Sequence, residues 1–147
     1  MERQLIDQYV TTGKVRFEYQ HFIVIDGNVG GSESRHAAEA SECANEQGRF
    51  WDYHATVFAN QQGEGSGAFA DRRLKAFAEA LGLDTEKFNA CFDAHKYAST
   101  VKADEQQARA RGVESTPTIF VNGQKVQNPM DFAELQRWIE GALAASN

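Results

Sequence analysis

The sequence predicts an α/β fold in which a small sheet is combined with a large helical block. Three stretches carry this prediction: an alternating segment over 14–22, helical patterns over 32–111, and a proline-led hairpin within 112–127. Neither a lone strand nor a lone hairpin is independently stable in water. We therefore expect the strand and the two hairpin strands to share one sheet.

The hairpin is the most specific local signal in the chain. A β-branched and aromatic run, Thr118–Val121, fits a buried strand, and Asn122-Gly123 after it is typical of a two-residue turn, with the return strand over Lys125–Gln127. Proline has no N–H to give to a sheet ladder, so Pro117 is expected at the start of the first strand. The Thr116-Pro117 bond is open to either isomer on this pattern, because the cis form of an X-Pro bond costs only about 0.5–1 kcal/mol.

Before the helical block, the pattern predicts a helix, a strand and a loop. Apolar residues near the N-terminus are spaced for the end of an amphipathic helix that stops at Gly13. From Lys14 to Phe22 the side chains alternate, with Val15, Phe17, Tyr19 and His21 on one face, as in a half-buried strand. Residues 26–32 have the composition of a loop.

The block over 32–111 predicts five helices, and a further helix follows the hairpin. Ser32 or Ser34 is expected to cap the first of them, Asp84 a later one, and Asp131 the final helix of the chain. The helix over 49–61 has an aromatic face next to Trp51, which we interpret as core packing; its members are Phe50, Tyr53, His54, Val57 and Phe58.

Composition excludes several classes of protein. The 147 residues are 41% hydrophobic and 24% charged, which is ordinary for one globular domain. A net charge of -6 argues against nucleic acid as a partner, because a phosphate-binding surface needs excess cations. No apolar run approaches the roughly 18 residues of a membrane span, and no signal peptide is expected after Met1.

Several motifs together resemble DsbA-like thiol–disulfide oxidoreductases, a branch of the thioredoxin superfamily. Residues 112–123, GVESTPTIFVNG, are similar to the cis-proline segment of that family, and residues 14–19 to the strand before its helical insertion. Residues 38–54 and 88–92 are similar to helices of the insertion itself. The resemblance covers essentially the whole chain in order.

The resemblance implies a thioredoxin-like fold with an inserted helical domain, lacking the first strand and the redox motif. Residues 1–147 then form a single domain, in which 1–25 and 112–147 are the incomplete thioredoxin-like part and 32–111 the inserted helical subdomain. The missing central strand leaves a gap in the sheet. Three solutions are open: the natural protein begins upstream, the remaining pieces close on each other, or a second copy of the chain fills the gap.

The redox motif of the family, Cys-x-x-Cys at a helix N-terminus, has no counterpart here. The two cysteines, Cys43 and Cys91, lie 48 positions apart. Thiol–disulfide exchange needs a thiolate whose pKa is lowered by the helix N-terminus and a second thiol that resolves the mixed disulfide. We therefore assign no catalytic residue and no cofactor, and we expect this chain alone to be inactive.

Cys43 and Cys91 admit three interpretations. Both lie on apolar helical faces, so they can be buried free thiols. By resemblance to DsbA-like proteins with an extra cysteine pair in the helical domain, they can instead form a structural disulfide, which suits an oxidising compartment. A metal site using Cys91 and His95, one helical turn apart, has no second ligand pair beside it, so we assign no metal.

The remaining site residues are also assigned by resemblance. In the family, the residue before the cis-proline faces the redox cysteines, and its backbone pairs with an extended peptide. Thr116 and Pro117 are therefore the candidate substrate-binding residues, and the implied partner is an unfolded or extended polypeptide in an extracytoplasmic compartment. The alternative is that Pro117 merely shapes the hairpin.

Three functions are compatible with these residues. The first is a DsbA-type oxidoreductase whose catalytic segment belongs to a longer form. The second is a non-catalytic thioredoxin-like module that binds peptides or another protein. The third is a related isomerase or transferase that uses glutathione.

Overall fold

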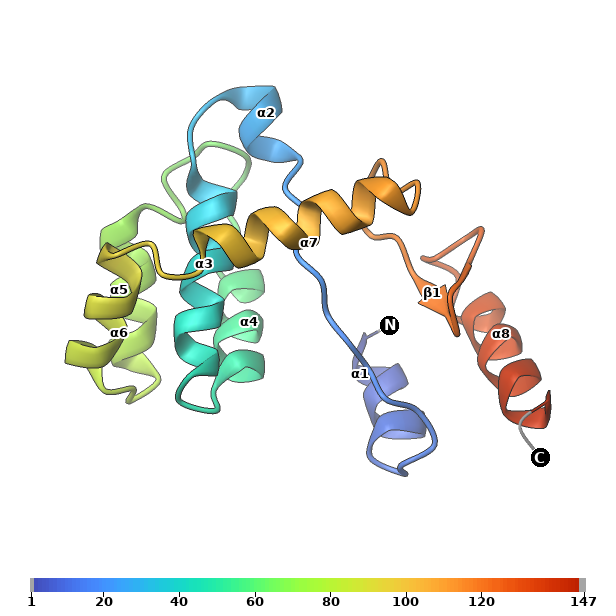
Figure 1. Ribbon diagram of the computed structural model, residues 1–147. Helices are drawn as coiled ribbons and strands as arrows, with labels where there is room; N and C mark the ends of the chain where they lie inside the picture. The colour runs from blue at the N-terminus through green and yellow to red at the C-terminus, as the bar shows by residue number, and fades with distance from the viewer. Residues whose placement is uncertain (1, 146–147) are drawn as a thin grey trace. The chain divides into compact units, whose positions relative to one another are not determined.

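The computed structural model of the chain describes residues 2–145 (Figure 1). The chain divides into two compact units, a sheet unit (residues up to Tyr19 and from Val113 onward) and a helical unit (Gln20–Gly112). In chain order the elements are α1 (Glu2–Leu5), the π-helix η1 (Ile6–Val10), α2 (Ile25–Val29), α3 (Glu33–Asn45), α4 (Phe50–Ala59), α5 (Asp71–Ala80), α6 (Thr85–Asp93), α7 (Ala98–Ala110), β1 (Phe120–Val121), β2 (Gln124–Lys125) and α8 (Phe132–Ala145). Among the described residues, no helix is long and apolar enough to cross a membrane.

The predicted hairpin is confirmed, but its first strand begins at Phe120, two residues later than predicted, so Pro117 lies before the strand and not at its start. β1 and β2 pair antiparallel, with Val121 opposite Gln124. Asn122 and Gly123 between them have φ values of 46° and 83°, the positive values that a type I′ turn requires. The return strand begins one residue earlier than predicted, and the Val126 N–H extends the pairing by donating to the Ile119 carbonyl at 2.9 Å.

The predicted strand over 14–22 is wrong. Residues 15–24 form no helix or strand, and the sheet in the described part of the chain has two strands, so this segment does not share it. Its alternation survives in the burial pattern, since Val15 and Phe17 are half-buried while Arg16 and Glu18 are exposed. Alternation determines which side chains of an extended segment are buried and which are exposed. A strand, however, exists only where its backbone pairs with another backbone.

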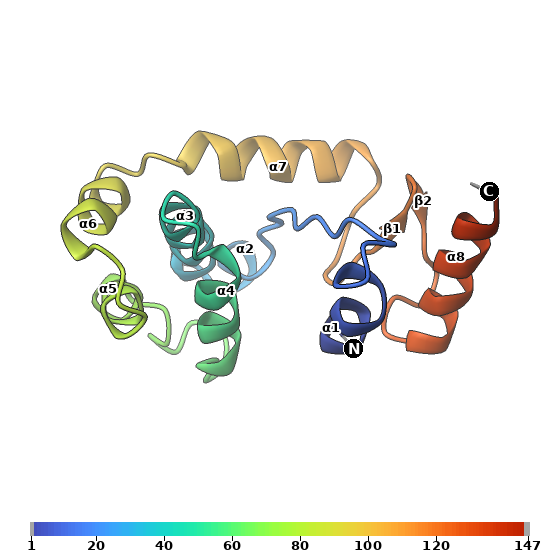
Figure 2. The ribbon, with the colours of Figure 1, turned by 90° about the horizontal axis from the view of Figure 1, so that it is seen from below.

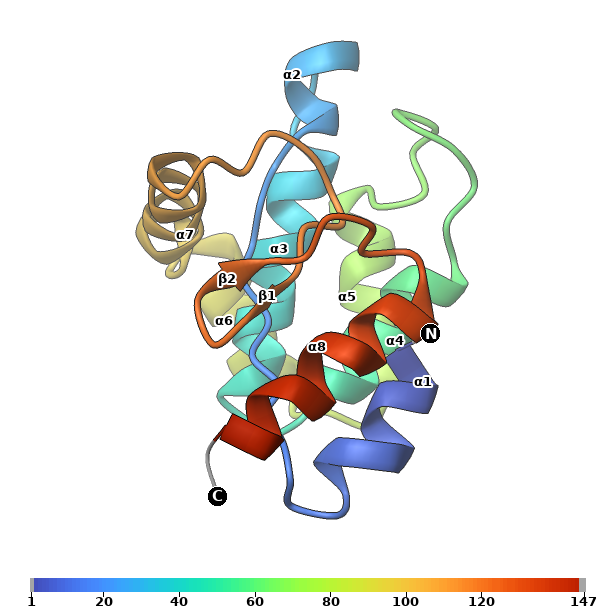
Figure 3. The same cartoon turned by 90° about the vertical axis from the view of Figure 1, so that its right-hand side faces the viewer.

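The sheet unit is built around the packing of the hairpin on α8 (Figure 3). Its core is a cluster of five buried side chains contributed by α1, η1, the end of the hairpin and α8: Leu5, Tyr9, Val126, Leu135 and Ile139. The Tyr9 hydroxyl donates to a Glu140 carboxylate oxygen at 2.8 Å and so joins η1 to α8. At the start of α8, the Asp131 carboxylate accepts from the Ala133 N–H at 2.9 Å, which confirms the predicted cap.

α3 is the central element of the helical unit, since α2, α4, α5, α6 and α7 all contact it (Figures 1 and 2). The core around it includes six side chains that are fully buried: Ala40, Ala44, Tyr53, Leu74, Ala78 and Phe88. The Tyr53 hydroxyl donates to the Leu74 carbonyl at 2.9 Å, so this buried polar group is satisfied inside the core.

The start of α3 differs from the prediction. Residues 25–29, which lie mostly in the predicted loop over 26–32, form the short helix α2, and Ser32 makes no side-chain cap. The Asp26 carboxylate instead accepts from the Ser34 and Arg35 N–H groups, both at 2.9 Å. A carboxylate satisfies two orphan N–H groups and favours the positive end of the helix, which a serine hydroxyl does less well.

The aromatic face of α4 is part core and part surface. Tyr53, His54 and Val57 are buried, as predicted. Trp51 and Phe58 are 43% and 52% exposed, so the interpretation of the whole face as core packing was wrong for these two residues.

Candidate functional site

The loop that contains Thr116 and Pro117 is anchored on both sides and exposed between its anchors. Val113 is buried before it, and Ile119, which pairs with Val126, follows it. The Thr118 hydroxyl donates to the Ser115 carbonyl at 2.7 Å and closes the loop around the proline. The Thr116–Pro117 peptide bond is cis, and both residues are exposed.

The backbone of this loop has unused hydrogen-bonding groups at Thr116. Within residues 2–145, the N–H and C=O groups of Thr116 form no hydrogen bond. In strand addition generally, unpaired main-chain groups of an exposed segment bond to an extended peptide. From Ser115 to Thr118 the loop carries hydroxyl groups but no ionisable side chain and no thiol.

A shallow groove lies elsewhere in the sheet unit, between the hairpin and α8. Its volume is about 580 Å³, and it does not include Thr116 or Pro117. Its lining is partly apolar and partly polar, with one cation, and consists of Val121, Asn122, Gln124, Arg137, Trp138, Gly141, Ala142 and Ala145.

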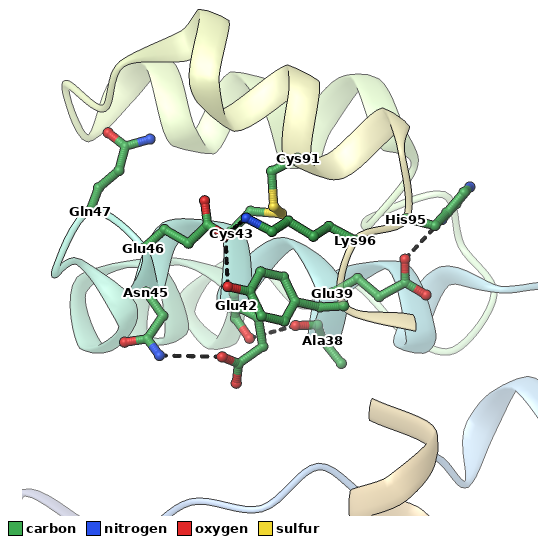
Figure 4. The surroundings of a disulfide bond; sticks show 12 residues. Ala38, Glu39, Glu42, Cys43, Asn45, Glu46, Gln47, Cys91, His95 and Lys96 are labelled. Carbon is green, nitrogen blue, oxygen red and sulfur yellow. Dashed lines mark hydrogen bonds and ion pairs between the residues drawn. A yellow bond between two sulfur atoms is a disulfide. The ribbon is translucent and has the colours of Figure 1, made fainter. Parts of the chain in front are cut away.

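Cys43 and Cys91 are joined by a disulfide between α3 and α6, with Cα atoms 5.9 Å apart (Figure 4). Cys43 is 1% exposed and Cys91 is 6% exposed. Neither sulfur is presented to a substrate at the surface. The bond also excludes the free-thiol alternative and removes Cys91 as a metal ligand in this state.

Three side chains of the segment between α6 and α7 bond to two glutamates (Figure 4). One glutamate lies in α3, and the other directly follows α3. His95 Nδ1 lies 2.8 Å from Glu39, while the Lys96 amine and the Tyr97 hydroxyl both donate to Glu46. The hydrogen bond from Lys96 lowers the pKa of Glu46, and the bond to Glu46 raises the pKa of Tyr97 to about 12. Ionised Glu46 is therefore favoured in the folded state, and its stabilising contribution is lost as the pH falls through its lowered pKa.

Sequence reasoning missed the histidine–carboxylate pairs of the helical unit. His21 and His36 showed no partner in the sequence. In the structure His21 Nε2 lies 2.9 Å from Glu42, and His36 Nδ1 lies 2.7 Å from Asp71. The bond to His21 lowers the pKa of Glu42. The partners come from positions 21 and 35 residues away, so no local spacing could have revealed them.

Comparison with known proteins defines the class. A thioredoxin family matches residues 1–141. The crystal structure of oxidised BdbD from Bacillus subtilis superposes with a TM-score of 0.85 and 26% sequence identity, over 97% of this chain and 76% of that one. The chain therefore belongs to the thioredoxin superfamily, and within it to the DsbA-like proteins that its sequence resembles.

Curated relatives of this chain are much longer proteins. The Na(+)/H(+) antiporter NhaA 3 of Salinispora tropica is 30% identical over 144 residues, which are 98% of this chain and 20% of the antiporter. The antiporter NhaA of Herminiimonas arsenicoxydans is 38% identical over 110 residues, 75% of this chain and 16% of that protein. The chain thus spans about a fifth of the length of the curated relatives it matches.

Proposed function

We propose that this chain is the peptide-binding part of a DsbA-like thiol–disulfide oxidoreductase and does not exchange disulfides by itself. The observation that carries the proposal is the combination of an exposed loop at Thr116 and Pro117, whose Thr116 backbone groups are unbonded within residues 2–145, with two cysteines that are both held in a buried disulfide. The loop offers a backbone for an extended polypeptide, while no Cys-x-x-Cys supplies an accessible thiolate. Thr116 and Pro117 are the residues that contact the substrate.

Other aspects of the proposal follow from the family. We place the full protein in an extracytoplasmic compartment, where a buried structural disulfide persists. Residues 1–25 and 112–147 act as the thioredoxin-like part, and residues 32–111 act as the inserted subdomain. A second copy of the chain is one way to complete the two-stranded sheet. Nucleic acid is not among the proposed partners, given the net charge of -6.

An insulin-reduction assay tests the absence of exchange activity. With dithiothreitol as reductant, this chain is expected to leave the rate of insulin precipitation at the uncatalysed background, because neither cysteine is accessible as a thiolate. A thioredoxin that carries Cys-x-x-Cys serves as the positive control. Turnover above background that disappears in the Cys43→Ala/Cys91→Ala variant would overturn this part of the proposal.

A second candidate function is that of a thioredoxin-like module attached to a sodium/proton antiporter. It is favoured by the match of 98% of this chain to a fifth of an antiporter relative. The coding sequence on either side of this chain separates the two candidates. In-frame transmembrane segments support the attached module, whereas an in-frame strand followed by Cys-x-x-Cys, without such segments, supports the oxidoreductase.

A further inference from the structure

Two imidazole rings lie side by side on the surface of the helical unit. His36 comes from α3 and His95 from the segment between α6 and α7, and their ring centroids are 5.3 Å apart with the planes tilted by 48°. The Phe92 ring packs against His36 at a right angle, with a centroid distance of 6.0 Å. The His36 side chain is 21% exposed and that of His95 is 53% exposed, so dissolved ions can reach both.

Each ring is held by a carboxylate through the same nitrogen. His36 Nδ1 lies 2.7 Å from Asp71, and His95 Nδ1 lies 2.8 Å from Glu39. An ionised carboxylate can only accept, so Nδ1 must carry the proton in both rings. In the neutral imidazole, Nε2 then has a free lone pair. A carboxylate on one ring nitrogen that fixes the tautomer and leaves the other nitrogen basic is the usual surrounding of metal-binding histidines.

A shared ion also requires a particular separation of the ring centres, provided that both Nε2 atoms face it. Histidine nitrogen binds Zn²⁺ at about 2.0–2.1 Å, and the ring centre lies about 1.1 Å beyond that nitrogen. Two imidazoles on one tetrahedral ion therefore have their centres about 5.2 Å apart. The observed 5.3 Å agrees with this value.

We propose that His36 and His95 form a binding site for a divalent first-row metal ion such as Zn²⁺, with Asp71 and Glu39 orienting the two rings. Imidazole nitrogen suits Zn²⁺, Cu²⁺ and Ni²⁺, and excludes Mg²⁺ and Ca²⁺ as preferred ions. In the part of the chain that the structure describes, no group of three His, Cys, Asp or Glu residues converges on one ion. Water completes the coordination, so the site is open and exchangeable rather than closed and structural.

The charge around the two rings suits a cation. Asp71 and Glu39 bring two negative charges to the site, which compensate the charge of the ion. The nearby lysines are each paired with another carboxylate, Lys75 with Asp93 and Lys96 with Glu46. Their positive charge is thus largely neutralised before a metal arrives.

Calorimetric titration of the full chain with zinc sulfate at pH 7.5 tests the site. One Zn²⁺ per chain is expected to bind, and the double variant His36→Asn/His95→Asn is expected to lose this binding. Asp71→Asn should weaken it by about tenfold, since orienting carboxylates contribute 10–100-fold to metal affinity. The matched variant Asp52→Asn, which removes an equally exposed carboxylate that is paired with Arg49 instead, should bind Zn²⁺ like the natural chain.

Two further readouts keep the result interpretable. Far-UV circular dichroism confirms that each variant is folded, and the Asp71→Asn result decides the matter if the double variant is not. Excess EDTA should also reverse the binding, because an ion at an open surface site exchanges readily. Failure of the natural chain to bind Zn²⁺, or binding that the double variant retains, would overturn the proposal.

Discussion

Replacing both Cys43 and Cys91 with alanine is expected to lower the free energy of unfolding by about 4 kcal/mol. The disulfide joins α3 to α6 across 48 sequence positions. A cross-link that closes a loop of this length removes many conformations from the unfolded chain, and their return favours unfolding. Urea unfolding followed by circular dichroism at 222 nm measures the change.

The natural chain under reducing conditions is the control for this variant. If the cross-link itself stabilises the fold, reduction should lower stability by a similar amount and leave the double variant unchanged. A loss below about 1 kcal/mol in the variant would contradict a stabilising role for the disulfide in the helical unit.

Phe88→Ala is expected to cost about 3–5 kcal/mol of stability. Phe88 is fully buried. The centroid of its ring lies 5.6 Å from the ring centroid of Tyr53 and 6.1 Å from that of Phe92. Truncation removes these contacts and leaves a cavity that the surrounding helices cannot fully close.

Phe58→Ala is the matched control, because it removes the same side chain from a position that is 52% exposed. Its cost should stay below about 1 kcal/mol, since a surface truncation leaves no cavity. Thermal or urea unfolding of the two variants side by side gives the comparison. Equal losses would show that burial of Phe88 does not anchor the helical unit.

The features that could be read from the sequence are those that depend on neighbouring residues. Asn122-Gly123 requires a positive φ at both positions, and Asp84 and Asp131 reach N–H groups within three residues of themselves. Both partners of each contact lie within a few residues of each other, so both can be recognised in the local sequence pattern.

The features that could not be read depend on how separate segments of the chain pack together. The segment over 15–24 has the alternation of a strand but no backbone that pairs with it in a sheet. Asp26 takes the role expected of Ser32 because α2 places its carboxylate beside the start of α3. The pairing of Glu39 with His95 likewise requires α6 to pack against α3. The sequence pattern indicates on which face of an element each residue lies, whereas the tertiary fold determines which partner that residue contacts.

An amide NMR titration with an extended, cysteine-free peptide tests most directly whether the cis-proline loop is a peptide-binding surface. We predict that shifts concentrate at Ser115, Thr116 and Thr118. We further predict that Thr116→Asp weakens binding by about tenfold, or 1.4 kcal/mol, because the new charge must lose water under the peptide. Thr12→Asp, at another exposed threonine of the sheet unit, should leave binding unchanged. Shifts confined to the helical unit, or equal binding by Thr116→Asp, would contradict the claim.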